Sequence, residues 1–169
     1  MKENLRALLS KRPGPGKLVW IGLRAERQAA MDEVVEAELL PERGLRGDYT
    51  SLGRGGGKRQ VSLLQAEHLD VVARLLRLAR VTPAELRRNL VVEGINLLAL
   101  RARKFRIGDV WLEGTGTCDP CSKMERALGV GGYNALRGHG GILARVLEGG
   151  WIRLGNEVDF VDDEVVAGD

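Results

Sequence analysis

Two cysteines three residues apart are the first candidates for chemistry in this chain. Cys118 and Cys121 stand where a predicted strand gives way to a predicted helix whose apolar face contains Met124 and Leu128. Free backbone N–H groups and the positive end of the helix dipole favour a thiolate in the first turn of a helix. A thiolate is both a soft metal ligand and a nucleophile, so Cys121, at the predicted helix start, is the leading candidate.

The sequence alone leaves other uses of the cysteine pair open. A structural zinc site needs four ligands, and only His68 and His139 stand ready to complete one, at spacings that are not typical of zinc sites. A thioredoxin-like disulfide is chemically reasonable, but the alternating βαβ pattern of such proteins is missing. Free cysteines are also common in protein cores without any chemical role.

A glycine-rich segment at residues 55–60 is a candidate anion-binding loop. It presents three glycines followed by Lys58 and Arg59. Successive backbone amides can form a nest for phosphate, and the two cations supply charge. The spacing is not that of a P-loop, and a solvated surface loop is the simpler interpretation of this segment alone.

A second basic segment contains Arg87 and Asn89, between a predicted helix start and a predicted buried strand. A guanidinium binds phosphate through two parallel hydrogen bonds, and an asparagine amide can bond to the edge of a heterocycle or fix a loop. Arg24, just after the first predicted strand, is a weaker candidate of the same type.

The charge distribution agrees with an anionic ligand. Residues 1–156 carry 26 bases against 17 acids, whereas the last 13 residues are acidic. Aromatic residues make up only 4% of the chain, too few for the stacking surfaces that bind single-stranded nucleic acid, and no DNA-binding motif is present. Nucleic acid is therefore not the expected partner, and a small phosphorylated ligand fits at least as well.

The elements that must position these residues are mostly short strands. The length predicts one domain, and the apolar patterns predict helices at residues 3–9 and 66–78 and a short helix after a capping box at Thr82 and Glu85. Strands are expected at residues 17–23, 34–40, 60–64, 90–92, 104–107, 110–113, 142–148 and 151–154. This pattern predicts an α+β fold, mainly β: a closed or partly closed barrel decorated by short helices.

Three local features refine this prediction. Val35, Ala37 and Leu39 alternate with acidic residues and should share one face of a single strand. Residues 44–58 are expected to form a mobile surface loop. The glycines at 108 and at 149–150 indicate hairpins between the strands that flank them.

The order of motifs resembles the MOSC family, named for the C-terminal domain of molybdenum cofactor sulfurase. The resemblance covers nearly the whole chain, as a short stand-alone member: an extension at residues 1–15, a MOSC domain at 16–158 and an acidic tail at 159–169. The matching motifs are Gly44-Leu45-Arg46-Gly47-Asp48, Lys58-Arg59-Gln60-Val61-Ser62-Leu63 with Gln65-x-Glu67-His68, Leu86-Arg87-Arg88-Asn89-Leu90-Val91-Val92, Phe105-x-Ile107-Gly108-Asp109, Cys118-x-Pro120-Cys121 and Gly140-Gly141-Ile142-x-Ala144.

The resemblance implies a β-barrel that binds the molybdenum cofactor, a pterin dithiolene with a terminal phosphate. Cys121 matches the family's metal ligand and would be the catalytic residue. Lys58, Arg59, Arg87 and Asn89 match residues beside the pterin or its phosphate. The residue before the ligand cysteine is often arginine in the reductases of the family but is proline here.

The implied activity is the reduction of small N-hydroxylated compounds, with electrons from a separate reductase. Two alternatives stay open: a non-catalytic carrier that holds the cofactor or a persulfide on Cys121 for an accepting enzyme, and a dithiol redox protein that uses Cys118 and Cys121. The chain has no apolar run long enough for a bilayer span or a secretory signal, so we expect a cytoplasmic protein with no membrane partner.

Overall fold

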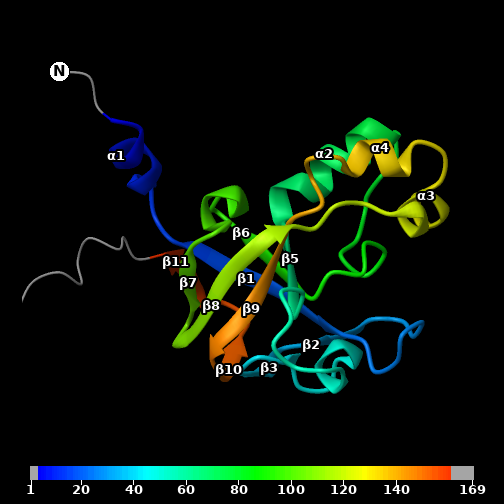
Figure 1. Ribbon diagram of the computed structural model, residues 1–169. Helices are drawn as coiled ribbons and strands as arrows, with labels where there is room; N and C mark the ends of the chain where they lie inside the picture. The colour runs from blue at the N-terminus through cyan, green and yellow to red at the C-terminus, as the bar shows by residue number, and fades with distance from the viewer. Residues whose placement is uncertain (1–3, 161–169) are drawn as a thin grey trace, which may run out of the picture.

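A closed β-barrel forms the centre of the computed structural model, which describes residues 4–160 (Figure 1). Within that part of the chain, seven strands form a ring in which β11 pairs back with β1. The order around the ring is β1 (Gly16–Leu23), β6 (Leu90–Glu93), β5 (Val61–Gln65), β9 (Ile142–Glu148), β8 (Val110–Thr117), β7 (Lys104–Ile107) and β11 (Glu157–Phe160). Among the ring strands of residues 4–160, only β5 and β6 pair in parallel. The predicted α+β class with a closed barrel is confirmed.

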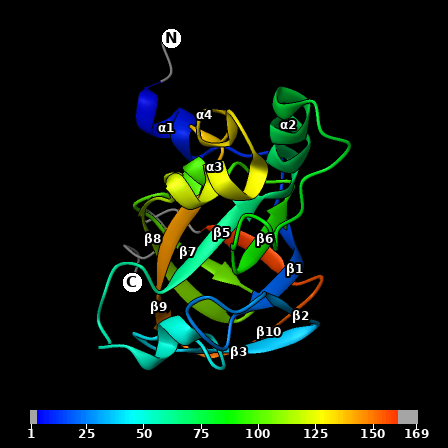
Figure 2. The same ribbon diagram turned by 90° about the vertical axis from the view of Figure 1, so that its right-hand side faces the viewer.

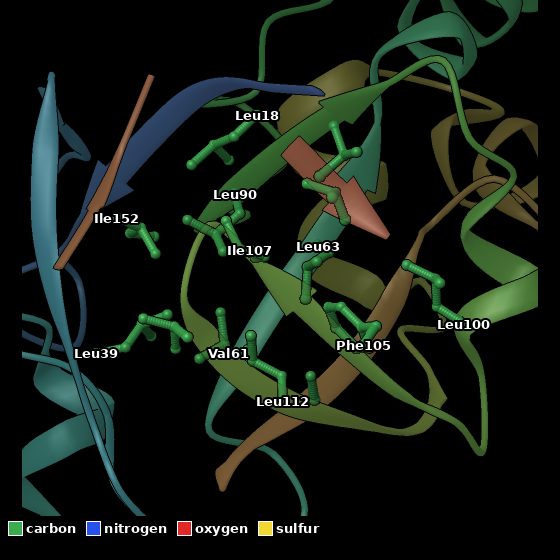
Figure 3. Packing of buried hydrophobic residues seen from close by; sticks show 14 of the residues in the cluster. Leu18, Leu39, Val61, Leu63, Leu90, Leu100, Phe105, Ile107, Leu112 and Ile152 are labelled. Atoms are coloured by element: carbon green, nitrogen blue, oxygen red, sulfur yellow. The ribbon is translucent and has the colours of Figure 1, made fainter. Parts of the chain in front are cut away.

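The barrel interior is filled by alternating side chains of its strands, as Figure 3 shows. Leu18, Leu63, Leu90 and Phe105 are completely buried there. Each such side chain contributes roughly 1.5–3 kcal/mol of burial free energy. Because aromatic residues are scarce, this core is mostly aliphatic.

A small second sheet lies at one end of the barrel and consists of β10 (Gly150–Arg153), β3 (Glu36–Leu40) and β4 (Gly44–Leu45). The hairpin predicted at residues 149–150 is therefore wrong: β9 stays in the barrel, while β10 pairs with β3, Ile152 opposite Ala37. Ile152 is completely buried in the barrel core. The glycines permit the turn, but burial of Ile152 beside Ala37 determines which strand β10 joins.

The predicted strand at residues 34–40 is divided at Val35. The residues before it form β2 (Asp32–Val34), which pairs with β1, and those after it form β3 in the second sheet. Ala37 and Leu39 are buried as predicted, but Val35 is 70% exposed. Val35 lies where the chain passes from one sheet to the other, so the alternation does not extend to it.

Three helices gather at the opposite end of the barrel, as Figures 1 and 2 both show: α2 (Ala66–Leu76), α3 (Ser122–Leu128) and α4 (Gly132–Leu136). A second hydrophobic cluster joins them to the outside of the barrel and includes Val72, Val91 and Met124. The helix predicted at residues 66–78 is confirmed, and it ends where Arg77 adopts a left-handed conformation. Two short 3-10 segments, η1 (Tyr49–Leu52) and η2 (Leu97–Leu100), complete the fold.

The helix predicted after Thr82 is wrong, although its capping interactions form. The Thr82 N–H and hydroxyl both donate to the Glu85 carboxylate, at 2.7 and 2.8 Å, and the Glu85 N–H donates to the Thr82 hydroxyl at 3.4 Å. The chain then makes consecutive turns instead of a helix, and Arg87 has a positive φ of 54°. These turns bury Leu86 and bring the chain to β6 within three residues.

The N-terminal extension contacts strand β11 of the barrel. It contains α1 (Leu5–Ser10), and the Arg12 that follows pairs with Asp159 and lies 4.5 Å from the centre of the Phe160 ring. The barrel strands run from Gly16 to Phe160. Most of the predicted acidic tail, and the first residue of the helix predicted at 3–9, lie outside the described residues. No helix of residues 4–160 is long and apolar enough to span a bilayer.

Candidate functional site

Four arginines line one cavity of about 270 Å³, which we call the arginine cavity: Arg24, Arg59, Arg87 and Arg88. No carboxylate side chain is among the described residues of its wall. The four cations repel one another, and the nearby carboxylate of Asp48 offsets this repulsion only in part, so the cavity attracts an anion. Guanidinium groups bind phosphate or carboxylate oxygens in pairs.

The barrel topology brings these distant residues together. Strand β6 lies between β1, which runs antiparallel to it, and β5, which runs parallel to it. The end of β1 therefore meets the starts of β5 and β6, where Arg24, Arg59 and Arg87 stand. Four of the five predicted cofactor-binding residues, these three and Asn89, line the arginine cavity.

Asn89 is buried, and its amide is fully engaged within the protein. Its Oδ1 accepts bonds from the N–H and hydroxyl of Ser62, and its NH₂ donates to the Gly22 carbonyl at 3.3 Å and to Asp48 at 3.1 Å. Asp48 also accepts bonds from the backbone N–H groups of Arg24 and Thr50, both at 3.0 Å. Asn89 and Asp48 thus fix the chain segments that carry the arginines.

This network overturns part of the loop prediction for residues 44–58. That segment contains β4 and η1, and Asp48 and Ser51 within it are buried. Gln60 connects the second half of the segment to the barrel. Its NH₂ donates to the Gly57 carbonyl at 2.7 Å, and its Oε1 accepts from the Val146 N–H at 2.9 Å. The glycine-rich, polar composition of the segment did not predict these hydrogen bonds, because buried polar residues give no apolar periodicity.

The arginines of the cavity have different roles. Arg88 is 7% exposed and donates to the carbonyls of Leu86, Gly140 and Cys118, at 2.7, 2.9 and 3.4 Å, so it is a structural residue. Arg24 has a buried Nε without a hydrogen-bond partner. Burial and the charge of Arg24 lower the pKa of Arg87 below its ordinary value, against the opposite effect of Asp48. Arg24 and Arg87 could therefore both bind an anion, although the Arg87 guanidinium already donates to the Arg27 carbonyl at 3.0 Å.

Lys58 lines a neighbouring cavity of about 230 Å³ rather than the arginine cavity. Arg59 and Gln60 line both spaces, so the two adjoin. The predicted glycine-rich segment therefore borders the site, with Lys58 exposed beside it.

The two cysteines occupy different environments. Cys121 is exposed and is the N-cap residue of α3, which agrees with its predicted place at the helix start. Cys118 is 7% exposed and lines the arginine cavity, and burial raises the pKa of its thiol, against the opposing influence of Arg88 and Arg59. Sequence reasoning did not place Cys118 in this wall. Its position depends on the hydrogen bond from its N–H to the Gly141 carbonyl, at 2.9 Å.

A second cavity, of about 250 Å³, also has Cys118 in its wall, and we call it the apolar cavity. Leu97, Leu98 and Ile142 supply apolar surface, and His68 lines it as well. The His68 ring meets the His139 ring edge to face, with centres 4.7 Å apart, and the Nδ1 atoms of both are buried without a hydrogen-bond partner.

The histidines and cysteines of residues 4–160 do not gather into a metal centre. Within that range, no three His, Cys, Asp or Glu side chains are arranged to hold a metal ion. The sequence suggested both histidines as possible zinc ligands and gave no indication that His68 lines a cavity.

The structure combines a closed β-barrel with a cation-lined cavity and a cysteine turn. The family model of the MOSC domain matches residues 51–159, more than half of the chain. The chain belongs to the MOSC domain family.

Solved structures of similar fold agree with this assignment. The YuaD protein of Bacillus subtilis has a TM-score of 0.75 at 18% identity, over 86% of this chain and 94% of that one. YiiM of Escherichia coli has a TM-score of 0.67 at 21% identity, over 86% and 70%. YiiM of Geobacillus stearothermophilus has a TM-score of 0.70 at 17% identity, over 90% and 78%. At these identities the likeness concerns the fold. No curated protein sequence matches the chain significantly.

Proposed function

We propose that this protein binds the molybdenum cofactor and uses it to reduce small N-hydroxylated compounds, with electrons from a separate reductase. The observation that carries the proposal is the arginine cavity: four guanidinium groups and no carboxylate in its described wall, in a MOSC barrel. The terminal phosphate of the cofactor is the anion that this cavity would take.

The residues present fit a phosphorylated ligand. Arg24 lines the cavity and its Nε has no hydrogen-bond partner, so this guanidinium could turn to bind a phosphate oxygen. Arg87 and Arg59 would add charge-assisted hydrogen bonds from the other sides. Lys58, in the adjoining cavity, would hold the part of the cofactor that extends past Arg59.

Cys121 is the proposed ligand of the metal. It is exposed and therefore accessible to a metal, whereas burial favours the protonated thiol at Cys118. The bound cofactor would supply the redox chemistry that removes the hydroxyl oxygen of the substrate. The chain would bind the phosphate, anchor the metal and orient the substrate.

The test is the metal and pterin content of the full chain produced in cells supplied with molybdate. We expect molybdenum and pterin to copurify with the protein, and Arg24→Gln combined with Arg87→Gln to lower both at least tenfold. Arg74→Gln combined with Arg126→Gln, on exposed helix positions, is the matched control and should change neither. Molybdenum at background level in a folded wild-type protein would refute the proposal.

The ligand assignment has its own test. Cys121→Ala should lose molybdenum, while Cys118→Ala should keep most of it. Equal losses in both variants would contradict the role given to Cys121.

The exposure of Cys121 also supports a second function, that of a carrier which passes the cofactor or a persulfide to another enzyme. An exposed thiolate is accessible to an acceptor protein as well as to a substrate. Turnover of an amidoxime by the molybdenum-loaded protein with an artificial electron donor would favour the enzyme, and loading without turnover would favour the carrier.

A further inference from the structure

The two cavities that share Cys118 in their walls have opposite electrostatic character. The arginine cavity has four cations and no carboxylate in its described wall, whereas the apolar cavity has the carboxylate of Asp119 and neither lysine nor arginine among the described residues that line it. An anion therefore has one clear place to bind at this site, and an uncharged molecule has another.

We propose that the apolar cavity binds the organic part of the substrate and selects small, uncharged, largely apolar N-hydroxylated compounds. The substrate class rests on the proposed function, but the ligand preference of the cavity does not. Cys118 separates this substrate pocket from the phosphate pocket.

The size and lining of the cavity support a ligand built on one ring. A cavity on the order of 150 Å³ with aliphatic walls is enough to bind benzene. The apolar cavity holds about 250 Å³ between Leu97 and Leu98 of η2 and Ile142 of β9. A ring with a short polar substituent therefore fits, and a larger conjugate does not.

His68 provides a polar contact suited to an N-hydroxyl group. Burial and the neighbouring His139 lower the pKa of His68, so its imidazole is uncharged at neutral pH. A neutral imidazole has one donor and one acceptor nitrogen, and His68 lines the apolar cavity. An oxime or hydroxylamine hydroxyl, which also donates and accepts, satisfies such a group.

Charge excludes anionic substrates from the same cavity. Asp119 is exposed at its wall and repels a carboxylate, and no lysine or arginine is among the described residues that line this cavity. A negatively charged analogue should therefore bind more weakly than its neutral parent, although the chain as a whole is basic.

Direct binding to the full chain, produced without molybdate, tests this inference independently of turnover. The probes are benzamidoxime, which is neutral, and its 4-carboxy derivative, titrated into the protein and followed by NMR. We expect benzamidoxime to perturb residues of the apolar cavity and to bind at least tenfold more tightly than the carboxylated probe. Inorganic pyrophosphate should perturb the arginine cavity instead.

Two variants locate the site. Leu98 is 52% exposed and lines the cavity, so Leu98→Trp should fill the space without disturbing the core and weaken benzamidoxime binding at least tenfold. Leu75→Trp, at a 60% exposed position of α2 outside the cavity, is the matched control and should leave binding unchanged. His68→Phe should weaken binding several-fold.

The inference is overturned if benzamidoxime fails to bind, if Leu98→Trp binds it as wild type does, or if the carboxylated probe binds equally well. These outcomes are distinct from failure of the proposed function. A protein that binds benzamidoxime in this cavity but carries no molybdenum would refute the cofactor proposal and leave the pocket assignment standing.

Discussion

Asn89 and Ser62 are joined by three hydrogen bonds. The Ser62 N–H and hydroxyl both donate to Asn89 Oδ1, at 3.2 and 3.0 Å, and the Asn89 N–H donates to the Ser62 hydroxyl oxygen at 3.0 Å. Ser62 belongs to β5 and Asn89 immediately precedes β6, so the pair connects the only parallel strands of the described barrel. Through Asp48 the same network reaches the segment that carries Arg24.

Replacement of Asn89 should destabilise the fold. Asn89→Ala leaves Asp48 and the Ser62 N–H without their buried partner, which should lower the free energy of unfolding by roughly 2–3 kcal/mol. Asn89→Asp should cost more, because it sets a second carboxylate against Asp48. Urea denaturation measures both effects. Asn134→Ala, at an exposed position of α4, is the control and should change stability by less than about 0.5 kcal/mol.

Gly141 should tolerate no side chain. Its φ is +86°, and a Cβ there would clash with the carbonyl oxygen of Leu63, so Gly141→Ala should lower stability by more than about 3 kcal/mol or prevent folding. Gly138 has a similar φ of +80° but open space around it. Gly138→Ala should therefore cost only about 1 kcal/mol, the conformational part of the effect. Similar losses in thermal denaturation of the two variants would contradict the steric explanation.

The features predicted correctly from the sequence are those with local causes. The strand β6 follows from a run of apolar residues, and the placement of Cys121 at a helix start follows from the apolar spacing of Met124 and Leu128. The anion-binding roles of Arg24, Arg59 and Arg87 stay predictions, although the three residues line one cavity. Their meeting in one cavity depends on strand order around the barrel, which the sequence does not display.

The features that could not be predicted depend on contacts between distant segments. The partner of β10 is decided by burial of Ile152 beside Ala37, not by the glycines before it. The capping pair Thr82 and Glu85 forms without a helix because β6 must begin soon afterwards. Cys118 and Cys121 have the same side chain, and only the packed structure shows that one is buried between two cavities.

The two thiols should react at very different rates. At pH 7.5 we expect iodoacetamide to modify exposed Cys121 at least tenfold faster than buried Cys118 in the native protein, and both equally in urea. Mass spectrometry of the two peptides measures the rates. Comparable native rates would show that the cysteine turn opens readily.

The raised pKa of Cys118 also predicts a loss of stability at alkaline pH. The folded protein keeps the Cys118 proton above pH 9.0, the ordinary value for the thiol, whereas the unfolded chain releases it there. The folded state then binds more protons than the unfolded state, so stability falls as pH rises through this range. Cys118→Ala should reduce that fall, and Cys121→Ala should not. Urea midpoints at pH 8 and pH 10 provide the measurement.

His68 should make the stability of the fold rise with pH in the acidic range, whereas Cys118 makes it fall with pH in the alkaline range. Burial, with a smaller effect of His139, lowers its pKa below the ordinary value of 6.5, so below pH 6.5 the unfolded chain binds the proton more readily than the folded protein does. The contribution of His68 to stability is therefore fully present above pH 6.5 and is lost as pH falls through the lower pKa of the folded state. His68→Phe should make the difference between urea midpoints at pH 7 and pH 5 smaller than in the wild type. An unchanged difference would mean that His68 is not desolvated in the folded protein and would weaken its assignment as a neutral hydrogen-bonding group in the apolar cavity.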